Sequence, residues 1–117
     1  MTRFPRSVYR RGDEPDARFS LANERTFLAW VRTSLALLAA GVALEALEVP
    51  ISPGFRLAAA LVFVALGVLA AVQSWVGWLR TEAALRENRA LPAPTGGLVI
   101  VIGVVAAVIL LALGFLL

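Results

Sequence analysis

Three long apolar blocks constrain the fold of this chain more than any motif in it. They cover about residues 27–49, 57–79 and 96–117. Each block is long enough to cross a bilayer as a helix, because a hydrocarbon core about 30 Å thick needs roughly 20 apolar residues. Of the 117 residues, 60% are hydrophobic and 16% are charged, which excludes a disordered chain. We therefore expect an all-α membrane protein with three transmembrane helices.

The first span is predicted to begin well before the membrane. No Pro or Gly follows Pro15 until Gly41, and Asp16 or Ser20 can cap a helix start. We predict one continuous helix from about residue 16 to about residue 47, extended on the cytoplasmic side. Residues 1–15 are expected to be a flexible, Arg-rich cytoplasmic tail, and residues 16–117 a single three-span membrane domain.

The connections between the blocks are short. Residues 50–54 form a turn-rich link, so the first two spans must be antiparallel neighbours. The second span is predicted to continue as a helix past the membrane, where Glu82 and Arg86, four residues apart, can pair. Pro92 and Pro94 then end that helical pattern.

The placement of the basic residues predicts the orientation. All eleven are Arg, and nine of them lie in the N-terminal segment before the first block or in residues 80–89. Because basic loops stay in the cytoplasm, we expect the N-terminus inside and the C-terminus outside a cell (inner or plasma) membrane. Three aromatic side chains near the inner helix ends are predicted to form a belt at that interface: Trp30, Trp75 and Trp78.

Arg18, Arg25 and Arg32 are spaced by seven residues on the first predicted helix. Seven residues are close to two turns, so the three side chains share a stripe about 21 Å long. One interpretation is that they only fix topology, with Arg32 reaching the headgroups from just inside the membrane. The other is that copies of the chain pack around this face, so that stacked Arg rings attract anions.

Other polar residues have less specific interpretations. Glu45 and Glu48 are expected to be water-exposed carboxylates near the outer interface, or to pair with Arg56 across the turn. Gln73 and Ser74 can hydrogen-bond between helices. A small-residue seam for close packing is predicted on the second span, at Ala60, Gly67 and Ser74. The third span reads as an outer, lipid-facing helix.

The composition excludes several function classes. The chain has no His, Cys or Lys, so thiol chemistry, imidazole catalysis and zinc binding are not expected. We predict no enzymatic activity, no cofactor and no metal site. The net charge of +3 is explained by membrane topology and anionic headgroups, so no nucleic-acid partner is expected.

Residues 22–30 read Ala-Asn-Glu-Arg-Thr-Phe-Leu-Ala-Trp, and through them the chain resembles the YidH-like family of small inner-membrane proteins with a domain of unknown function. The resemblance runs from about Arg18 to Leu117. The same three-span domain is similar to the membrane part of the eukaryotic vacuolar transporter chaperone complex, a multi-subunit polyphosphate channel. That complex makes the polymer with a separate soluble domain, so synthesis is not implied for this chain.

The resemblance implies roles for several residues. Arg25 would match a pore-lining Arg, and Arg18 a basic residue one heptad earlier. Glu24 and Arg80 would belong to the same set and pair on the inner side. Arg32 is a departure from the pattern of the vacuolar proteins. A homo-oligomer of about five copies is expected by analogy.

Two functions remain open at this point. The first is a homo-oligomeric pore or translocation subunit for anions such as phosphate or polyphosphate, with Arg18, Arg25 and Arg32 along the path. The alternative is a structural or regulatory membrane subunit that docks a cytoplasmic partner or anionic lipid through its Arg-rich segment.

Overall fold

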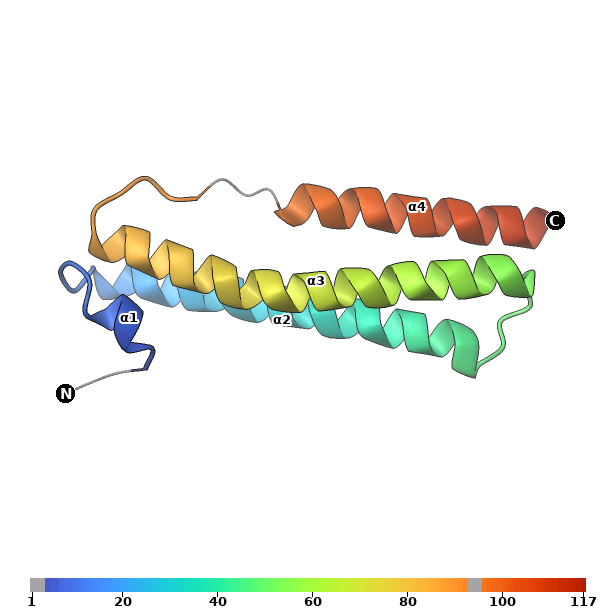
Figure 1. Ribbon diagram of the computed structural model, residues 1–117, viewed down its shortest axis with the longest axis horizontal. Coiled ribbons are helices and arrows are strands. Elements are labelled where there is room, and N and C mark those ends of the chain that lie inside the picture. Colours follow the sequence, from blue (N-terminus) through green and yellow to red (C-terminus); the bar gives the residue numbers. More distant parts are fainter. Residues whose placement is uncertain (1–3, 93–95) are drawn as a thin grey trace.

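The computed structural model describes residues 4–92 and 96–117. All of the secondary-structure elements in these residues are α-helices. The described helices are α1 (Arg6–Tyr9), α2 (Ala17–Ala46), α3 (Pro53–Arg86) and α4 (Gly96–Leu116). The last three run along the long axis of a molecule that measures 58 × 25 × 20 Å (Figure 1). They are the three described helices that are long and apolar enough to cross a membrane. The predicted all-helical chain with three candidate spans is therefore confirmed.

The start of α2 is capped by a carboxylate. Asp16 accepts a hydrogen bond from the backbone N–H of Arg18 at 2.9 Å, and its other oxygen pairs with the Arg18 guanidinium at 3.0 Å. The guanidinium, together with the backbone N–H, holds the pKa of the Asp16 carboxyl below its ordinary value. From this cap α2 continues for 30 residues, about 45 Å, without a break. Its bounds agree with the predicted helix.

The helix α3 is the longest element and lies between α2 and α4. Pro53 occupies its first turn, where a missing N–H costs nothing, and Asn88 takes a left-handed conformation just after its end. Its 34 residues span about 51 Å, well beyond a hydrocarbon core of about 30 Å. The predicted continuation of this helix past the membrane is therefore seen.

The helix α4 covers only part of α3, as Figure 1 shows. It begins at Gly96, where a side chain would meet Gln73 and Trp30, and at its far end Gly114 lies against Ile51 and Phe55. Its 21 residues match the thickness of a hydrocarbon core. The first turns of α2 and the last turns of α3 consequently project beyond the slab that all three long helices share.

Small residues bring α2 and α3 close together within that slab. A Cβ on Gly67 would lie 2.6 Å from Leu38 Cγ, and one on Gly41 would lie 2.8 Å from the carbonyl oxygen of Ala60. Ala60, Gly67 and Ser74 are all buried, so the predicted seam is confirmed. Ser74 does not bond between helices, however, because its hydroxyl donates to the carbonyl of Ala71 in its own helix at 2.6 Å.

The turn between α2 and α3 lies at the end of the slab away from the projecting helix ends, and an ion pair holds it. Arg56 Nε lies 3.1 Å from Glu45 Oε1, and Arg56 Nη1 donates to the carbonyl of Val49 at 3.0 Å. Glu45 is therefore the residue that pairs across the turn, and Glu48 is exposed. Of the two interpretations, the pair with Arg56 is therefore confirmed for Glu45, because the short link places Arg56 within reach.

Candidate functional site

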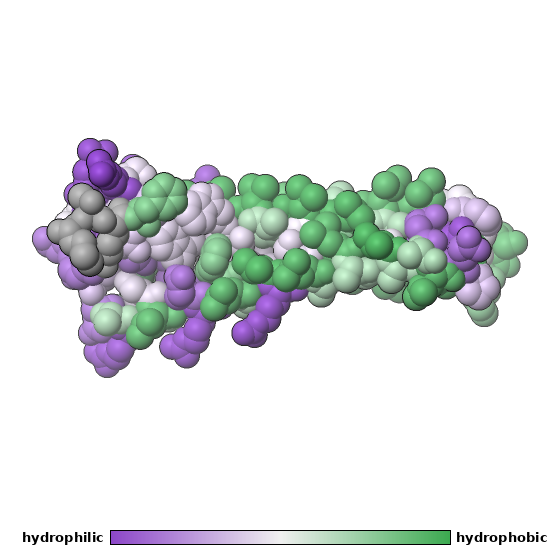
Figure 2. All heavy atoms as spheres, turned by 90° about the horizontal axis from the view of Figure 1, so that it is seen from below, coloured by the Kyte–Doolittle hydropathy of each residue, from purple (hydrophilic) through white to green (hydrophobic). Residues whose placement is uncertain are grey.

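The stripe of arginines lies on the face of α2 that points away from α3. Arg18, Arg25 and Arg32 are all exposed. The buried side of the same helix is formed by different residues, namely Asn23, Ser34, Leu37 and Gly41. Figure 2 shows hydrophilic side chains projecting from one edge of the molecule, beside its apolar surface. The structure thus keeps the three arginines on one face, as their spacing predicts.

The three arginines differ in their partners. Arg18 is paired with Asp16, its neighbour at the start of α2, at 3.0 Å. Arg25 and Arg32 have no ion pair or hydrogen bond to another residue in the described part of the chain. Their guanidinium groups are therefore available to a ligand, to a headgroup or to a second copy of the chain.

Glu24 points toward α3, as its place beside the stripe predicts, but its partner is not Arg80. Glu24 Oε2 accepts a hydrogen bond from Trp78 Nε1 at 3.0 Å. Arg80 is exposed and forms no ion pair with any described residue. The pairing that the resemblance implied between Glu24 and Arg80 is thus not formed within one copy of the chain.

The buried carboxylate at this end of the bundle is Glu82, which is only 3% exposed. Its two oxygens accept hydrogen bonds from Ser20 Oγ at 2.9 Å and from Asn23 Nδ2 at 3.2 Å. Asn23 Nδ2 also donates to the backbone carbonyl of Trp78. Residues from the start of α2 are thereby joined to the last turns of α3 through a polar junction, which we call the Glu82 junction (Ser20, Asn23, Trp78 and Glu82).

The sequence did not indicate this role for Glu82. A pair with Arg86 on the same helix was expected, and that prediction is wrong, because Glu82 turns toward α2 while Arg86 turns toward the N-terminal segment. One signal for the junction was present. Ser20 and Asn23 are three residues apart and share a helix face, and Glu82 is followed by two alanines whose small side chains allow close approach to α3.

Arg86 fastens the N-terminal segment to α3. It is 5% exposed, and it donates to the carbonyls of Arg11 at 2.9 Å and Tyr9 at 3.0 Å. It also pairs with Glu14 at 3.2 Å and lies over the Tyr9 ring at 5.3 Å. A single buried guanidinium therefore holds both ends of residues 9–14.

The backbone of the same segment also contacts the end of α3. The N–H of Asp13 donates to the carbonyl of Arg86 at 2.9 Å, beside Gly12 at φ +51°. A Cβ on Gly12 would lie 1.9 Å from that carbonyl oxygen, so only glycine fits this turn. Where the sequence indicated a flexible tail, residues 4–14 thus follow a defined path along α3, because Arg86 supplies donors that their carbonyls need.

The predicted aromatic belt divides into two parts. Trp75 and Trp78 stack at 5.6 Å between ring centroids, and Phe27 and Tyr9 add edge contacts at 6.5 and 6.2 Å. Trp30 instead packs partly buried against the core cluster of the three long helices. Trp75 and Trp78 thus form one aromatic cluster with Phe27 and Tyr9, whereas Trp30 contributes to helix packing.

These features define a class of protein: a small membrane protein whose first two long helices extend together beyond one side of the bilayer. Residues 18–84 match the model of a domain of unknown function, DUF202. The chain is 44% identical over 108 residues to the inner membrane protein YidH of Escherichia coli (strain K12), covering 91% of this chain and 94% of that protein. It is 45% identical over 105 residues to the protein Rv2272 of Mycobacterium tuberculosis (strain ATCC 25618 / H37Rv), covering 85% and 86%.

The chain therefore belongs to the DUF202 family and is a relative of YidH. No solved structure matches it. The name of its relative and its three candidate spans make it a multi-pass inner membrane protein. The matched region contains the arginine stripe and the whole Glu82 junction.

Proposed function

We propose that this protein forms a homo-oligomer in which the outer face of α2 lines a path for anions such as phosphate or polyphosphate. The observation that carries the proposal is the exposure of Arg32. This residue is exposed on a membrane helix and has no ion-pair or hydrogen-bond partner among the described residues.

The depth of Arg32 makes this exposure costly in a single copy. We take the end of α2 at Ala46 as the outer boundary, because the Glu45–Arg56 ion pair lies beside it. Arg32 is then about 21 Å from that boundary along the helix, inside a hydrocarbon core about 30 Å thick. An Arg that faces lipid costs up to about 2.5–3.5 kcal/mol on insertion scales, the value for the centre of the bilayer. Packing of several copies around water would remove this cost.

The chemistry of the stripe suits anions. A guanidinium group offers a planar fork of donors that binds phosphate oxygens in pairs. Rings of such groups occur in pores that select anions. Arg25 and Arg32 have no ion pair with the residues that the structure describes, so we expect them to contribute more than Arg18, whose charge is partly offset by Asp16.

The resemblance of residues 22–30 to the membrane part of the vacuolar transporter chaperone complex supports the same proposal. By that resemblance, first-span helices of several copies would line a polyphosphate path with basic residues, and Arg25 and Arg18 would fall at the matching places. By this analogy we propose about five copies. We also propose that α1 and the projecting ends of α2 and α3 lie in the cytoplasm, because most of the arginines are on that side.

The test has two measurements on the intact protein in lipid. Native mass spectrometry in nanodiscs should give one closed oligomer. Phosphate flux into proteoliposomes should fall about tenfold or more in Arg32→Gln and Arg25→Gln, as for the loss of one charged contact of about 1.4 kcal/mol.

Arg10→Gln is the matched control, because it removes the same charge from an exposed residue outside α2. A monomer in lipid would contradict the proposal. So would phosphate flux that Arg32→Gln and Arg10→Gln change equally. A soluble protein that co-purifies with the chain regardless of Arg32 would point to a docking subunit instead.

A further inference from the structure

A pocket of about 490 Å³ lies beside the last turns of α3, on the side that faces α1. Its walls come from α1, from α3 and from residues 89–92, and within the described residues no part of α2 lines it. Its volume falls in the range of about 300–1,000 Å³ that is usual for small-molecule sites. It is thus formed within one copy of the chain and is separate from the arginine stripe.

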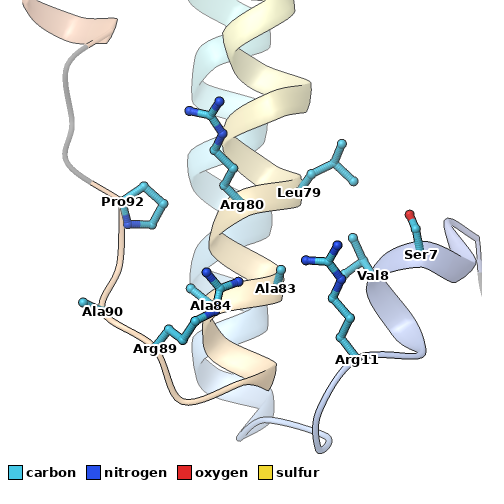
Figure 3. Close-up of a pocket in the computed structure, with 10 residues that line it drawn as sticks. All are labelled: Ser7, Val8, Arg11, Leu79, Arg80, Ala83, Ala84, Arg89, Ala90 and Pro92. Carbon is cyan, nitrogen blue, oxygen red and sulfur yellow. The ribbon is translucent and has the colours of Figure 1, made fainter.

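Three arginines surround this pocket, each from a different segment. Arg11 follows α1, Arg80 lies on α3, and Arg89 lies just after α3. In Figure 3 the side chains of Arg11 and Arg89 extend toward one another across α3, and Arg80 extends from about one turn farther along the helix. The guanidinium groups of Arg11 and Arg89 therefore approach the same space, and Arg80 extends the basic lining of the pocket farther along α3.

The charges around the pocket are not balanced. Arg11 and Arg89 share a single carboxylate, Glu87, at 3.7 and 2.7 Å. Arg80 has no ion pair with any described residue. Three positive charges against one negative charge leave a local excess of two around the pocket.

The pocket exists because of two features of the fold. Ala83 and Ala84 form its floor, and their small side chains leave room above α3. The wall on the α1 side is held in place by Arg86, whose hydrogen bonds to residues 9 and 11 fix that segment against α3. The shape of the pocket is thus set before any ligand binds, which lowers the entropy cost of binding.

We propose that this pocket is a binding site for a phosphate group. Arginine forks bind phosphate oxygens in pairs, and a phosphate group has enough oxygens to bind more than one fork. Arg80 lies two residues after Trp78, close to the interface at which lipid headgroups sit. The phosphate can therefore belong to an anionic lipid or be free in solution, and both sources present the same chemistry to the arginines.

The experiment measures binding of two probes to the intact protein. Inorganic phosphate is titrated calorimetrically into protein in nanodiscs made only of phosphatidylcholine. Retention of phosphatidylglycerol is measured by native mass spectrometry on protein from mixed nanodiscs. We expect the wild type to bind at least one probe, and Arg80→Gln and Arg89→Gln to bind it about tenfold more weakly.

Arg80→Gln is the cleaner variant, because Arg80 has no described partner and its loss leaves no carboxylate unpaired. Arg10→Gln, which removes the same charge from an exposed residue outside the pocket, should leave binding unchanged. This site and the proposed anion path can fail separately, because the path is tested by phosphate flux in Arg32→Gln and the site by binding in Arg80→Gln. Saturation by inorganic phosphate identifies a free anion, and retention of phosphatidylglycerol alone identifies a lipid.

Two results would overturn the site. One is that neither probe binds to the wild type. The other is that Arg80→Gln and Arg10→Gln weaken binding to the same extent, because binding would then follow the overall charge of the protein and not the pocket.

Discussion

The contact between α2 and α3 changes its chemistry along its length. At the projecting end, the two helices are joined by the carboxylate of Glu82, which accepts hydrogen bonds from Ser20 and Asn23. Within the membrane slab, the same helices meet at Gly41 and Gly67, with one hydroxyl contact from Ser34 to the carbonyl of Gly67 at 2.7 Å. The contact at the projecting end thus depends on hydrogen-bonded polar groups, and the contact within the slab depends on the close approach of the two backbones.

The difference follows from the solvent on each side. Near water, apolar burial favours association, and a buried carboxylate is tolerated when both of its oxygens are hydrogen-bonded. In lipid, apolar side chains gain nothing by leaving the surroundings, so association depends on small residues and interhelical hydrogen bonds. A carboxylate there would be expensive. The projecting end should therefore be destabilised most by loss of a polar partner, and the membrane slab by an added side-chain carbon at the close contact.

The largest effect is expected at the Glu82 junction. Glu82→Ala would leave the Ser20 hydroxyl and one Asn23 N–H without their partner, and should lower the free energy of unfolding by about 2–4 kcal/mol. The measurement is thermal or denaturant unfolding of the protein in a mild detergent. Glu87→Ala is the control and should cost less than about 1 kcal/mol, because its ion pairs are solvent-exposed. Equal losses would show that the junction does not stabilise the fold.

The next effect tests close packing in the membrane slab. Gly41→Ala places a Cβ 2.8 Å from the carbonyl oxygen of Ala60, so overpacking should cost about 1–3 kcal/mol in the same unfolding experiment. Gly97→Ala is the matched control. Nothing lies within 4 Å of its new Cβ, and it should be neutral or stabilising by up to about 1 kcal/mol. If Gly41→Ala and Gly97→Ala lower the free energy of unfolding to the same extent, close packing does not hold α2 and α3 together in the membrane slab.

A smaller effect is expected for the hydroxyl bond that Ser34 forms between α2 and α3 within the membrane slab. Ser34→Ala removes the bond to Gly67 and should cost about 0.6 kcal/mol, and at most about 1.7 kcal/mol. Thr33→Ala is the control, because the Thr33 hydroxyl bonds only to Ala29 in its own helix. If Ser34→Ala costs as much as Glu82→Ala, hydrogen bonding and not close packing dominates the slab as well.

The smallest effect concerns the exposed cap of α2. The Arg18 guanidinium and backbone N–H lower the pKa of Asp16. The charged carboxylate therefore stabilises the fold fully at pH values above 3.8, the ordinary pKa of this group. That contribution is lost as the pH falls through the lower pKa of the folded protein. Helicity by circular dichroism should fall slightly more in the wild type than in Asp16→Asn below this pH, because Asn caps a helix without titrating. Identical acid profiles would rule out a role for the Asp16 charge.

Much of the fold could be predicted because it depends on local pattern. The apolar blocks, the turn at residues 50–54 and the Pro-free run after Pro15 determine where helices begin and end, and the bounds of α2 and α4 agree with the prediction. The seven-residue spacing placed the three stripe arginines on one face for the same reason. In each case the relevant distance lies within one helix, where geometry is regular.

The partners of individual side chains could not be predicted in the same way. Glu82 had an acceptable partner one turn away at Arg86, and Glu24 had one by analogy at Arg80, yet both turn to other residues. The partner of each carboxylate depends on which donors the neighbouring helix places beside it, and so on how the two helices are aligned along their axes. That alignment of α2 and α3 depends on the close packing at Gly41 and Gly67, many residues away.

The sequence by itself determined that this chain is a three-span membrane protein with a stripe of arginines on its first span. Hydrophobic length and helical period are properties of consecutive residues, so they need no knowledge of the rest of the molecule. Only the tertiary structure decided that Arg86 docks the N-terminal segment, that Glu82 is buried, and that Arg11, Arg80 and Arg89 surround one pocket. These contacts join segments up to 77 residues apart, and they form because buried polar groups must find partners wherever the packing of the helices places them.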